Sequence, residues 1–293
     1  MIFLILSIFV SVLFGISFKI IAVKNINAFQ AIIVNYVVAG ILGFVTTKSN
    51  VTPLNIFEQS WIYVAIGLGI VFISSLFVIA ETTAKSGISV AQVANRMSVV
   101  VPISIAVIFY GDILSLAKII GILLAIAAVY LVSHKEDKQN VSQKFWWLFP
   151  VIIFICSGII DSTINYAQRY LLKEDDFDAF LSTIFATAFV FGFIVLLYQM
   201  IITKEKFQGK AIPAGIILGT INFGTMYFII SALNTNILEP SALFPINNLS
   251  ILTISTLISV VVFKERLSPK NWLGIGLSLL AILILGLMPQ LIK

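Results

Sequence analysis

A short polar turn separates two long apolar runs near the end of the chain, and it reads Phe263-Lys264-Glu265-Arg266-Leu267-Ser268-Pro269-Lys270-Asn271-Trp272-Leu273-Gly274. The same pattern occurs earlier, as Phe109-Tyr110-Gly111-Asp112-Ile113-Leu114-Ser115-Leu116-Ala117-Lys118-Ile119-Ile120-Gly121. In both copies an acidic residue stands two positions before Leu-Ser and nine positions before a glycine, so Asp112 corresponds to Glu265. A turn that is repeated between long apolar runs predicts a chain built from two copies of one unit.

The composition indicates that lipid is the solvent for most of the chain. Of the 293 residues, 60% are hydrophobic and 11% are charged, whereas soluble domains carry about 25% charged residues. A soluble core could not hide this much apolar surface. The net charge is +5, but the basic residues are spread over short connections, which argues against nucleic acid as a partner. The single cysteine, Cys156, excludes an intrachain disulfide.

The apolar runs are long enough to cross a bilayer. A spanning helix needs about 20 mostly apolar residues, and lipid offers the backbone no hydrogen-bond partners, so these runs are predicted to be helices. The apolar N-terminal run is interpreted as a retained first span, because no basic segment precedes it as in a signal peptide. The ten expected spans are 2–21, 29–46, 61–80, 88–110, 116–133, 146–170, 179–202, 211–233, 240–263 and 271–287. We therefore predict an all-α polytopic membrane protein.

The two copies of the turn divide the spans into equal groups. The charged connection 135–145 separates a first repeat, 1–134, from a second repeat, 146–293, and each repeat holds five spans. In the register set by Leu-Ser, Asn95 corresponds to Asn248. Because five is odd, the second repeat is expected to cross the membrane in the opposite direction. Many secondary transporters have such inverted repeats and bind substrate near the midplane at the repeat interface.

At this point the sequence resembles the drug/metabolite transporter superfamily, in its EamA-like branch. The resemblance covers nearly the whole chain, and its most specific part is the turn used twice between the fourth and fifth spans of each half. Pro102 also stands where the fourth span of the family often carries a proline. Two positions depart from the family pattern: Asp112 replaces the usual glutamate and Lys264 the usual glycine. The resemblance implies ten helices and transport of small metabolites or drugs, typically export of amino acids and related compounds.

Two indications of membrane orientation disagree. Connections that lead from odd-numbered to even-numbered spans carry eleven Lys and Arg residues, and the other connections with the C-terminal tail carry five. The positive-inside rule would place both termini outside, whereas the family resemblance implies cytoplasmic termini. The expected location is the inner or plasma membrane of the cell, and the sequence leaves the oligomeric state open, with a monomer as one alternative.

Charged residues within spans are the first candidates for substrate binding or coupling, because each costs at least about 2.5 kcal/mol to insert. Asp161, Asn165 and Gln168 are spaced to share one face of a helix, which is predicted to line a water-filled cavity. Asp161 could carry a proton or contact a cationic group; the alternative is a structural ion pair. Arg96 could bind a carboxylate or phosphate bidentately. The other charged candidates are Lys19, near the end of the first span, and Glu81, expected to end the third.

Neutral polar residues within spans form a second set of candidates. They are predicted to point inward, away from lipid, and interhelical hydrogen bonding is the alternative to substrate contact. This set is Asn35, Tyr36, Asn95, Asn222, Tyr227, Asn247 and Asn248.

The leading hypothesis is a secondary transporter with a small-molecule substrate and alternating access. No Gly-x4-Gly-Lys-Ser/Thr loop is present to bind ATP, so a proton gradient or exchange would supply the energy. An enzyme is disfavoured because the only histidine, His134, lies in the mid-chain connection, and no metal or cofactor site is expected. The alternative class is a membrane channel, sensor or scaffold without coupled transport.

Overall fold

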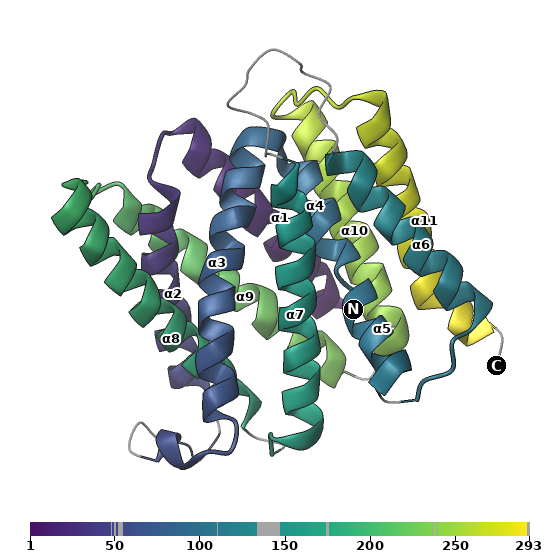
Figure 1. The fold of residues 1–293 in the computed structure, drawn as a ribbon, viewed down its shortest axis with the longest axis horizontal. Coiled ribbons are helices and arrows are strands. Elements are labelled where there is room, and N and C mark those ends of the chain that lie inside the picture. Colours follow the sequence, from purple (N-terminus) through teal and green to yellow (C-terminus); the bar gives the residue numbers. More distant parts are fainter. Residues whose placement is uncertain are drawn as a thin grey trace. The chain divides into compact units, whose positions relative to one another are not determined.

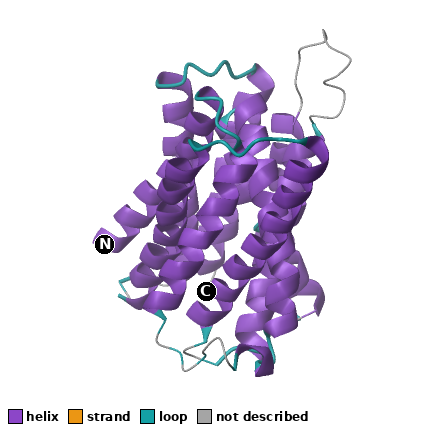
Figure 2. Ribbon diagram, turned by 90° about the vertical axis from the view of Figure 1, so that its left-hand side faces the viewer, coloured by secondary structure: helices purple, strands orange, loops and turns teal. Residues whose placement is uncertain are grey.

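The computed structural model describes residues 1–47, 49, 51, 55–109, 111–133, 147–173, 176–235, 237–238 and 240–291. Within these residues every regular element is a helix (Figure 1), and none of them forms a strand (Figure 2). Ten helical segments of the described chain are long and apolar enough to cross a membrane. The predicted fold class, an all-α polytopic membrane protein, is thereby confirmed. The predicted connection 135–145 lies outside the described residues.

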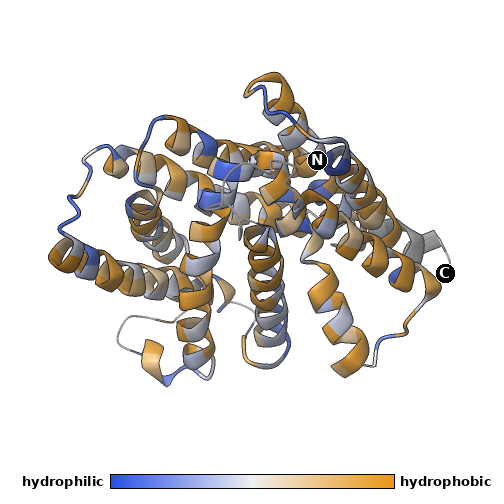
Figure 3. Ribbon diagram, turned by 45° about the horizontal axis from the view of Figure 1, so that its top comes forward, coloured by the Kyte–Doolittle hydropathy of each residue, from blue (hydrophilic) through white to orange (hydrophobic). Residues whose placement is uncertain are grey.

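Polar connections end the apolar runs, so most helices begin and end within a few residues of the predicted positions (Figure 3). The long helix α3 continues to Ser86, past its predicted end at residue 80, which puts Glu81 inside a helix and not at its end. The elements are α1 (Ile2–Val23), α2 (Ala28–Thr46), the short 3₁₀ helix η1 (Ile56–Glu58), α3 (Ile62–Ser86), α4 (Ile88–Met97), α5 (Val100–Phe109), α6 (Leu116–Ser133), α7 (Leu148–Tyr170), α8 (Phe177–Tyr198), the π-helical turn η3 (Gln199–Thr203), α9 (Ala211–Asn234), α10 (Pro240–Val261) and α11 (Pro269–Leu291).

The fourth span is interrupted, where a continuous helix over 88–110 was expected. It consists of α4 and α5, with Ser98 and Val99 in a turn between them. Pro102 explains the position of the break, because its nitrogen has no hydrogen to donate to the carbonyl four residues earlier. The carbonyl of Ser98 instead accepts from the N–H of Val101 at 2.9 Å. The corresponding span of the second half, α10, contains Pro245 yet stays one helix.

Residue contacts group the chain into two compact units. Unit 1 comprises Met1–Lys19, Val78–Gly158 and Gly224–Lys293, and unit 2 comprises Ile20–Phe77 and Ile159–Phe223. Each unit draws on both halves of the sequence, so the units are not the predicted repeats. Contacts do not test symmetry, and the division into repeats 1–134 and 146–293 stays a prediction.

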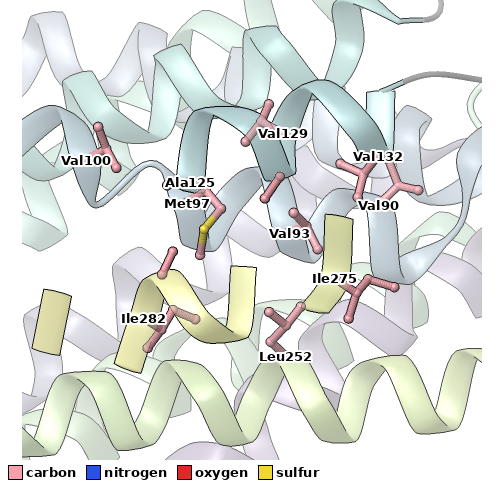
Figure 4. Close-up of a cluster of buried hydrophobic side chains, with 12 residues drawn as sticks. Val90, Val93, Met97, Val100, Ala125, Val129, Val132, Leu252, Ile275 and Ile282 are labelled. Carbon is pink, nitrogen blue, oxygen red and sulfur yellow. The ribbon is translucent and has the colours of Figure 1, made fainter. Parts of the chain in front are cut away.

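The core of unit 1 lies where α6 and α11 pack against each other and against α4 and α10 (Figure 1). Glycines allow close approach: a Cβ on Gly274 of α11 would lie 3.0 Å from the carbonyl oxygen of Ala128 on α6. Gly121 of α6 lies against the side chain of Leu285 on α11. The buried apolar side chains of this core include Val90, Val93, Met97, Val100, Ala125, Val129, Val132, Leu252, Ile275 and Ile282 (Figure 4).

In unit 2, α2 and α8 pack against each other, and the buried apolar core joins α8 to α3 and α7. Small residues again allow close approach, since Gly43 of α2 meets Ser182 of α8, and a Cβ on Gly192 of α8 would lie 3.0 Å from Cγ1 of Ile33. At one end of this core the rings of Trp61 and Phe180 meet edge to face, with centroids 5.5 Å apart. Close packing of small residues is how helices associate where lipid provides no hydrophobic driving force.

Three of these helix pairs join spans that correspond between the sequence halves: α2 with α8, α4 with α10, and α6 with α11. Their contacts run in opposite order along the two helices, as the contacts of Gly121 and Gly274 illustrate, so the partners are antiparallel. Antiparallel pairing of equivalent spans is the arrangement that an inverted repeat would produce. The inverted repeat of the whole chain stays a prediction.

Candidate functional site

The acidic residue of the second turn, Glu265, lies at the meeting point of three helices of unit 1. Its Oε1 is 2.6 Å from Nζ of Lys19 on α1. Its Oε2 accepts from Oγ of Ser259 on α10 at 2.5 Å and from the N–H of Ile88, the first residue of α4, at 3.1 Å. Only 10% of the Glu265 side chain is exposed. The carboxylate therefore ties α1, α4 and α10 together.

Local sequence explains why the N-terminus of α4 receives this carboxylate. Gly87 precedes the helix with φ of 103°, in the region that favours glycine, and a Cβ there would collide with the Glu265 side chain. The first N–H groups of a helix have no partner within the helix and carry partial positive charge, which an anion stabilises. Lys19, a predicted site residue, thus pairs with Glu265, which the sequence analysis had treated as part of a turn.

A polar cluster surrounds the break in the fourth span. Nη1 of Arg96, one residue before the end of α4, donates to Oδ1 of Asn248 on α10 at 2.9 Å. Oγ of Ser157 on α7 donates to Oδ1 of Asn95 at 2.8 Å. Asn247, next to Asn248, accepts from Ser7 of α1 at 3.3 Å. Of the predicted site residues in unit 1, Arg96 and Asn248 thus bond to each other, whereas Asn95 and Asn247 bond to serines of α7 and α1.

One face of α1 lies along both groups of contacts. Ser7, Ser11, Gly15 and Lys19 are spaced four residues apart and share that face. Between the contacts of Ser7 and Lys19, a Cβ on Gly15 would lie 2.6 Å from Nε2 of Gln92 on α4. Small residues on α1 thus give it close access to α4 within the described part of unit 1.

Sequence reasoning missed several polar residues of this region. Gln92 and Ser89 share the α4 face of Arg96, and Ser89 donates to Oγ of Ser259 at 2.9 Å. Oε1 of Gln92 and Oγ of Ser255 are buried without a hydrogen-bond partner among the described residues. The available signal was the periodicity of polar residues along residues 88–97, which predicts one polar helix face.

In unit 2, two further predicted residues pair with each other. Nδ2 of Asn222 on α9 donates to Oδ1 of Asn35 on α2 at 3.1 Å, and both side chains are buried. Nδ2 of Asn35 is 3.4 Å from the carbonyl oxygen of Ile32. Tyr36 is fully buried beside Phe185, and its hydroxyl has no hydrogen-bond partner in the described part of the chain. The Asn35–Asn222 pair matches the alternative of interhelical hydrogen bonding.

The predicted stripe on α7 is exposed. Asp161, Asn165 and Gln168 are all accessible, and Nε of Arg169 donates to Oδ1 of Asn165 at 3.3 Å. These three residues share a helix face as expected, and their role in lining a cavity stays a prediction.

The last two predicted residues lie on α3 and α9. Glu81 forms an ion pair with Lys85 one turn along α3. Tyr227 is 49% exposed, and its ring packs edge to face on Phe228. In the described residues no group of three or more His, Cys, Asp or Glu side chains is arranged to hold a metal ion.

Comparisons with known proteins agree with this architecture. An uncharacterized protein of Haemophilus influenzae is 29% identical over 297 residues, which cover 99% of each chain. A crystal structure of another protein aligns over 98% of both chains with a TM-score of 0.59; at 15% identity this shows a likeness of fold alone. Residues 148–287 match the model of the EamA-like transporter family. With ten described helices long and apolar enough to span a bilayer, the chain is a multi-pass membrane protein, and its second half is similar to the EamA-like transporter family.

Proposed function

We propose that the chain is a secondary active transporter that moves a small metabolite or drug-like solute by alternating access, with export of an amino-acid-type solute as the favoured activity. The observation that carries the proposal is the broken fourth span, with Arg96 beside the break and bonded to Asn248 of the corresponding span. The family match supports the coarser part, transport of small solutes across a membrane.

A break in a spanning helix points to a functional region. In lipid, backbone groups outside a regular helix are tolerated only where protein or water satisfies them. Transporters place such discontinuous helices at the substrate site, where polar backbone and side chains face the solute. Asn95 and Arg96, in the last turn of α4 before this break, bond to Ser157 and Asn248, which supports a role for this cluster in solute contact.

The chemistry of the cluster favours a solute with a carboxylate. Arg96 carries a planar guanidinium, which binds a carboxylate through two parallel hydrogen bonds. Nη1 of Arg96 donates to the neutral amide oxygen of Asn248. A charge-assisted bond is roughly twice as strong as a neutral one, so a solute carboxylate would compete well with Asn248 for Arg96.

The exposed stripe on α7 of unit 2 is a second, separate candidate. Asp161 is an acidic group within a span, and such residues commonly mark substrate or ion pathways. We assign Asp161 to contact with a cationic group of the solute or to proton transfer, with Asn165 and Gln168 supplying hydrogen bonds. If Asp161 is essential for gradient-driven transport, Asp161→Asn abolishes it, and an unchanged rate would remove Asp161 from that role.

A two-step experiment tests the proposed function. Purified protein is first screened by thermal shift against amino acids, nucleotide sugars, cationic drugs and purines, because ligands stabilise the state that they bind. Carboxylate-bearing compounds should raise the melting temperature of the wild type and of the control Arg169→Gln, and should fail to do so in Arg96→Gln.

The compound with the largest shift is then used for counterflow in proteoliposomes. A carrier exchanges labelled solute against unlabelled solute trapped inside, whereas a channel, sensor or scaffold shows no counterflow. Counterflow by the wild type supports the proposal, and its absence with a compound that binds would overturn it.

A further inference from the structure

Two polar connections of unit 2 meet at one end of its helices. They are residues 24–27, between α1 and α2, and residues 204–210, between η3 and α9. We propose that their four lysines form a binding site for the headgroup of an anionic phospholipid. These four residues, the lysine patch, are Lys24, Lys204, Lys206 and Lys210. The proposal does not depend on the proposed transport function.

Hydrogen bonds hold the two connections together. The N–H of Asn27, the residue before α2, donates to Oε1 of Gln208 at 2.9 Å. The N–H of Gln208 donates in turn to Oε1 of Gln30, in the first turn of α2, at 2.7 Å. Nε2 of Gln30 donates to the carbonyl oxygen of Lys206 at 3.2 Å. The backbone of Lys206 is therefore held at the N-terminus of α2, to which Lys24 leads.

The one acidic residue of these connections is engaged away from the lysines. Glu205 stands between Lys204 and Lys206 in the sequence, yet its Oε1 accepts from Nδ2 of Asn27 at 2.6 Å. Among the described residues, none of the four lysines of the patch forms an ion pair, whereas three other lysines do. Those three are Lys19, Lys85 and Lys118. The four exposed charges of the patch are thus available to an anion from outside the chain.

The position of the patch favours a lipid over a free anion. Lys24 directly follows α1, and Lys204 directly follows η3, so both stand where an apolar span ends. The side chains just before them are apolar and exposed, and they are Val23, Met200, Ile201 and Ile202. Basic residues at this level meet lipid headgroups, while the apolar residues meet acyl chains. A phospholipid contacts both parts of this surface, whereas free phosphate contacts the lysines alone.

The charge of the patch is large enough to give a measurable preference. One lysine beside an anionic lipid surface strengthens binding about fivefold. Four such lysines together should favour an anionic lipid at least about 100-fold over a neutral lipid with the same acyl chains. Because the charges are exposed, this preference should decrease as salt is added.

The test is native mass spectrometry of the purified full-length chain in neutral detergent, titrated with phosphatidylglycerol or with phosphatidylcholine. Wild type should bind phosphatidylglycerol more tightly. Lys206→Gln should lower the affinity for phosphatidylglycerol about fivefold and leave that for phosphatidylcholine unchanged. The variant with glutamine at all four positions of the patch should lose at least about tenfold in affinity for phosphatidylglycerol. An unchanged affinity in that variant would overturn the proposal.

A matched lysine and a free anion provide the controls. Lys173 is exposed and lies between α7 and α8, at the opposite end of α8 from Lys204. Lys173→Gln should change the affinity for phosphatidylglycerol less than about twofold. Equal losses in Lys173→Gln and Lys206→Gln would overturn the assignment to the patch. Displacement of the lipid by inorganic phosphate at the same concentration would overturn the assignment to a lipid.

The contact of Glu205 with Asn27 allows a test that keeps every lysine. Asn27→Ser retains an oxygen that can cap α2 but removes Nδ2, so the Glu205 carboxylate becomes available to Lys204 and Lys206. The affinity for phosphatidylglycerol should therefore fall. Adding Glu205→Gln should restore it to the wild-type level, and a failure to restore it would overturn the electrostatic account of the patch.

The backbone of Lys204 separates lipid binding from stability. Lys204 has φ of 54°, in the left-handed region that favours glycine. Lys204→Gly should raise the melting temperature in neutral detergent because it relieves this strain, and it should lower the affinity for phosphatidylglycerol about fivefold because it removes a charge. A variant that melts higher and keeps its full affinity for phosphatidylglycerol would exclude Lys204 from the binding site.

Discussion

Asp112 and Glu265 occupy the same position of the repeated turn, yet their surroundings differ. The backbone is alike in both copies: the preceding residues, Gly111 and Lys264, have φ of 73° and 51°. Each acid N–H bonds to the carbonyl six residues earlier, at 3.2 Å for Asp112 and 3.1 Å for Glu265. The side chain of Asp112 is 50% exposed and 3.5 Å from Lys118, whereas that of Glu265 is 10% exposed and 2.6 Å from Lys19.

This difference shows that the backbone conformation of the turn and the role of its acidic side chain have separate causes. Local sequence sets the backbone of the turn, because the left-handed residue and the return hydrogen bond involve only neighbouring residues. Tertiary packing sets the role of the acid, because Lys19 and the N-terminus of α4 come from distant parts of the chain. Asp112, in contrast, forms its ion pair with Lys118, which is six residues along the chain.

The largest expected effect comes from removing each acid. Glu265→Ala leaves Lys19, Ser259 and the Ile88 N–H without their shared acceptor, so it should lower the unfolding free energy by about 3–5 kcal/mol. Asp112→Ala removes an exposed pair and should cost less than about 1 kcal/mol. Denaturant unfolding in micelles measures both. Equal losses of unfolding free energy in Glu265→Ala and Asp112→Ala would contradict the difference between the two turns.

A smaller effect on stability is expected from Gly274, the glycine of the second repeated motif, which lies in the first turns of α11. Gly274→Ala places a methyl group 3.0 Å from the carbonyl oxygen of Ala128, and such overpacking costs about 1–3 kcal/mol. Gly276 on the same helix has no neighbouring atom within 4 Å of an added Cβ. Gly276→Ala is therefore the matched control and should stay within about 1 kcal/mol of the wild type. Similar melting temperatures for both variants would refute close α6–α11 packing at Gly274.

The smallest effects concern the left-handed residue of each turn. Lys264→Gly should stabilise the protein by about 0.5–1 kcal/mol, because glycine adopts a positive φ without strain. Gly111→Ala should destabilise it by about the same amount for the opposite reason. Lys264→Ala keeps the strain and serves as the control. If the two turns share one backbone geometry, Lys264→Gly raises the melting temperature and Gly111→Ala lowers it. A change in the same direction for both variants would exclude the shared geometry.

Much of the fold could be predicted because lipid leaves the backbone few choices. An apolar run of about 20 residues must form a helix in a bilayer, so the ten spans follow from composition and length. The break between α4 and α5 was not predicted, because the sequence does not say whether a proline such as Pro102 bends a helix or interrupts it. The end of α3 was misplaced because the charged residues Glu81 and Lys85 lie within the helix, where they form an ion pair one turn apart.

The site could be predicted only in part. Polarity within spans identified Arg96, Asn248 and their neighbours, and the structure brings them together. The Lys19–Glu265 pair was not foreseen, because its members are far apart in sequence and Glu265 was interpreted only as part of the repeated turn. Serines such as Ser259 carried no signal of their own, since serine is common in packed membrane helices.

A double-mutant cycle tests the contrast between the two turns most directly. Lys19→Met and Glu265→Gln, singly and together, give the coupling energy of the second turn, and Lys118→Met with Asp112→Asn gives that of the first. We predict more than about 1.5 kcal/mol of unfolding free energy for Lys19 with Glu265, and less than about 0.5 kcal/mol for Lys118 with Asp112. Equal coupling in the two turns would contradict the account.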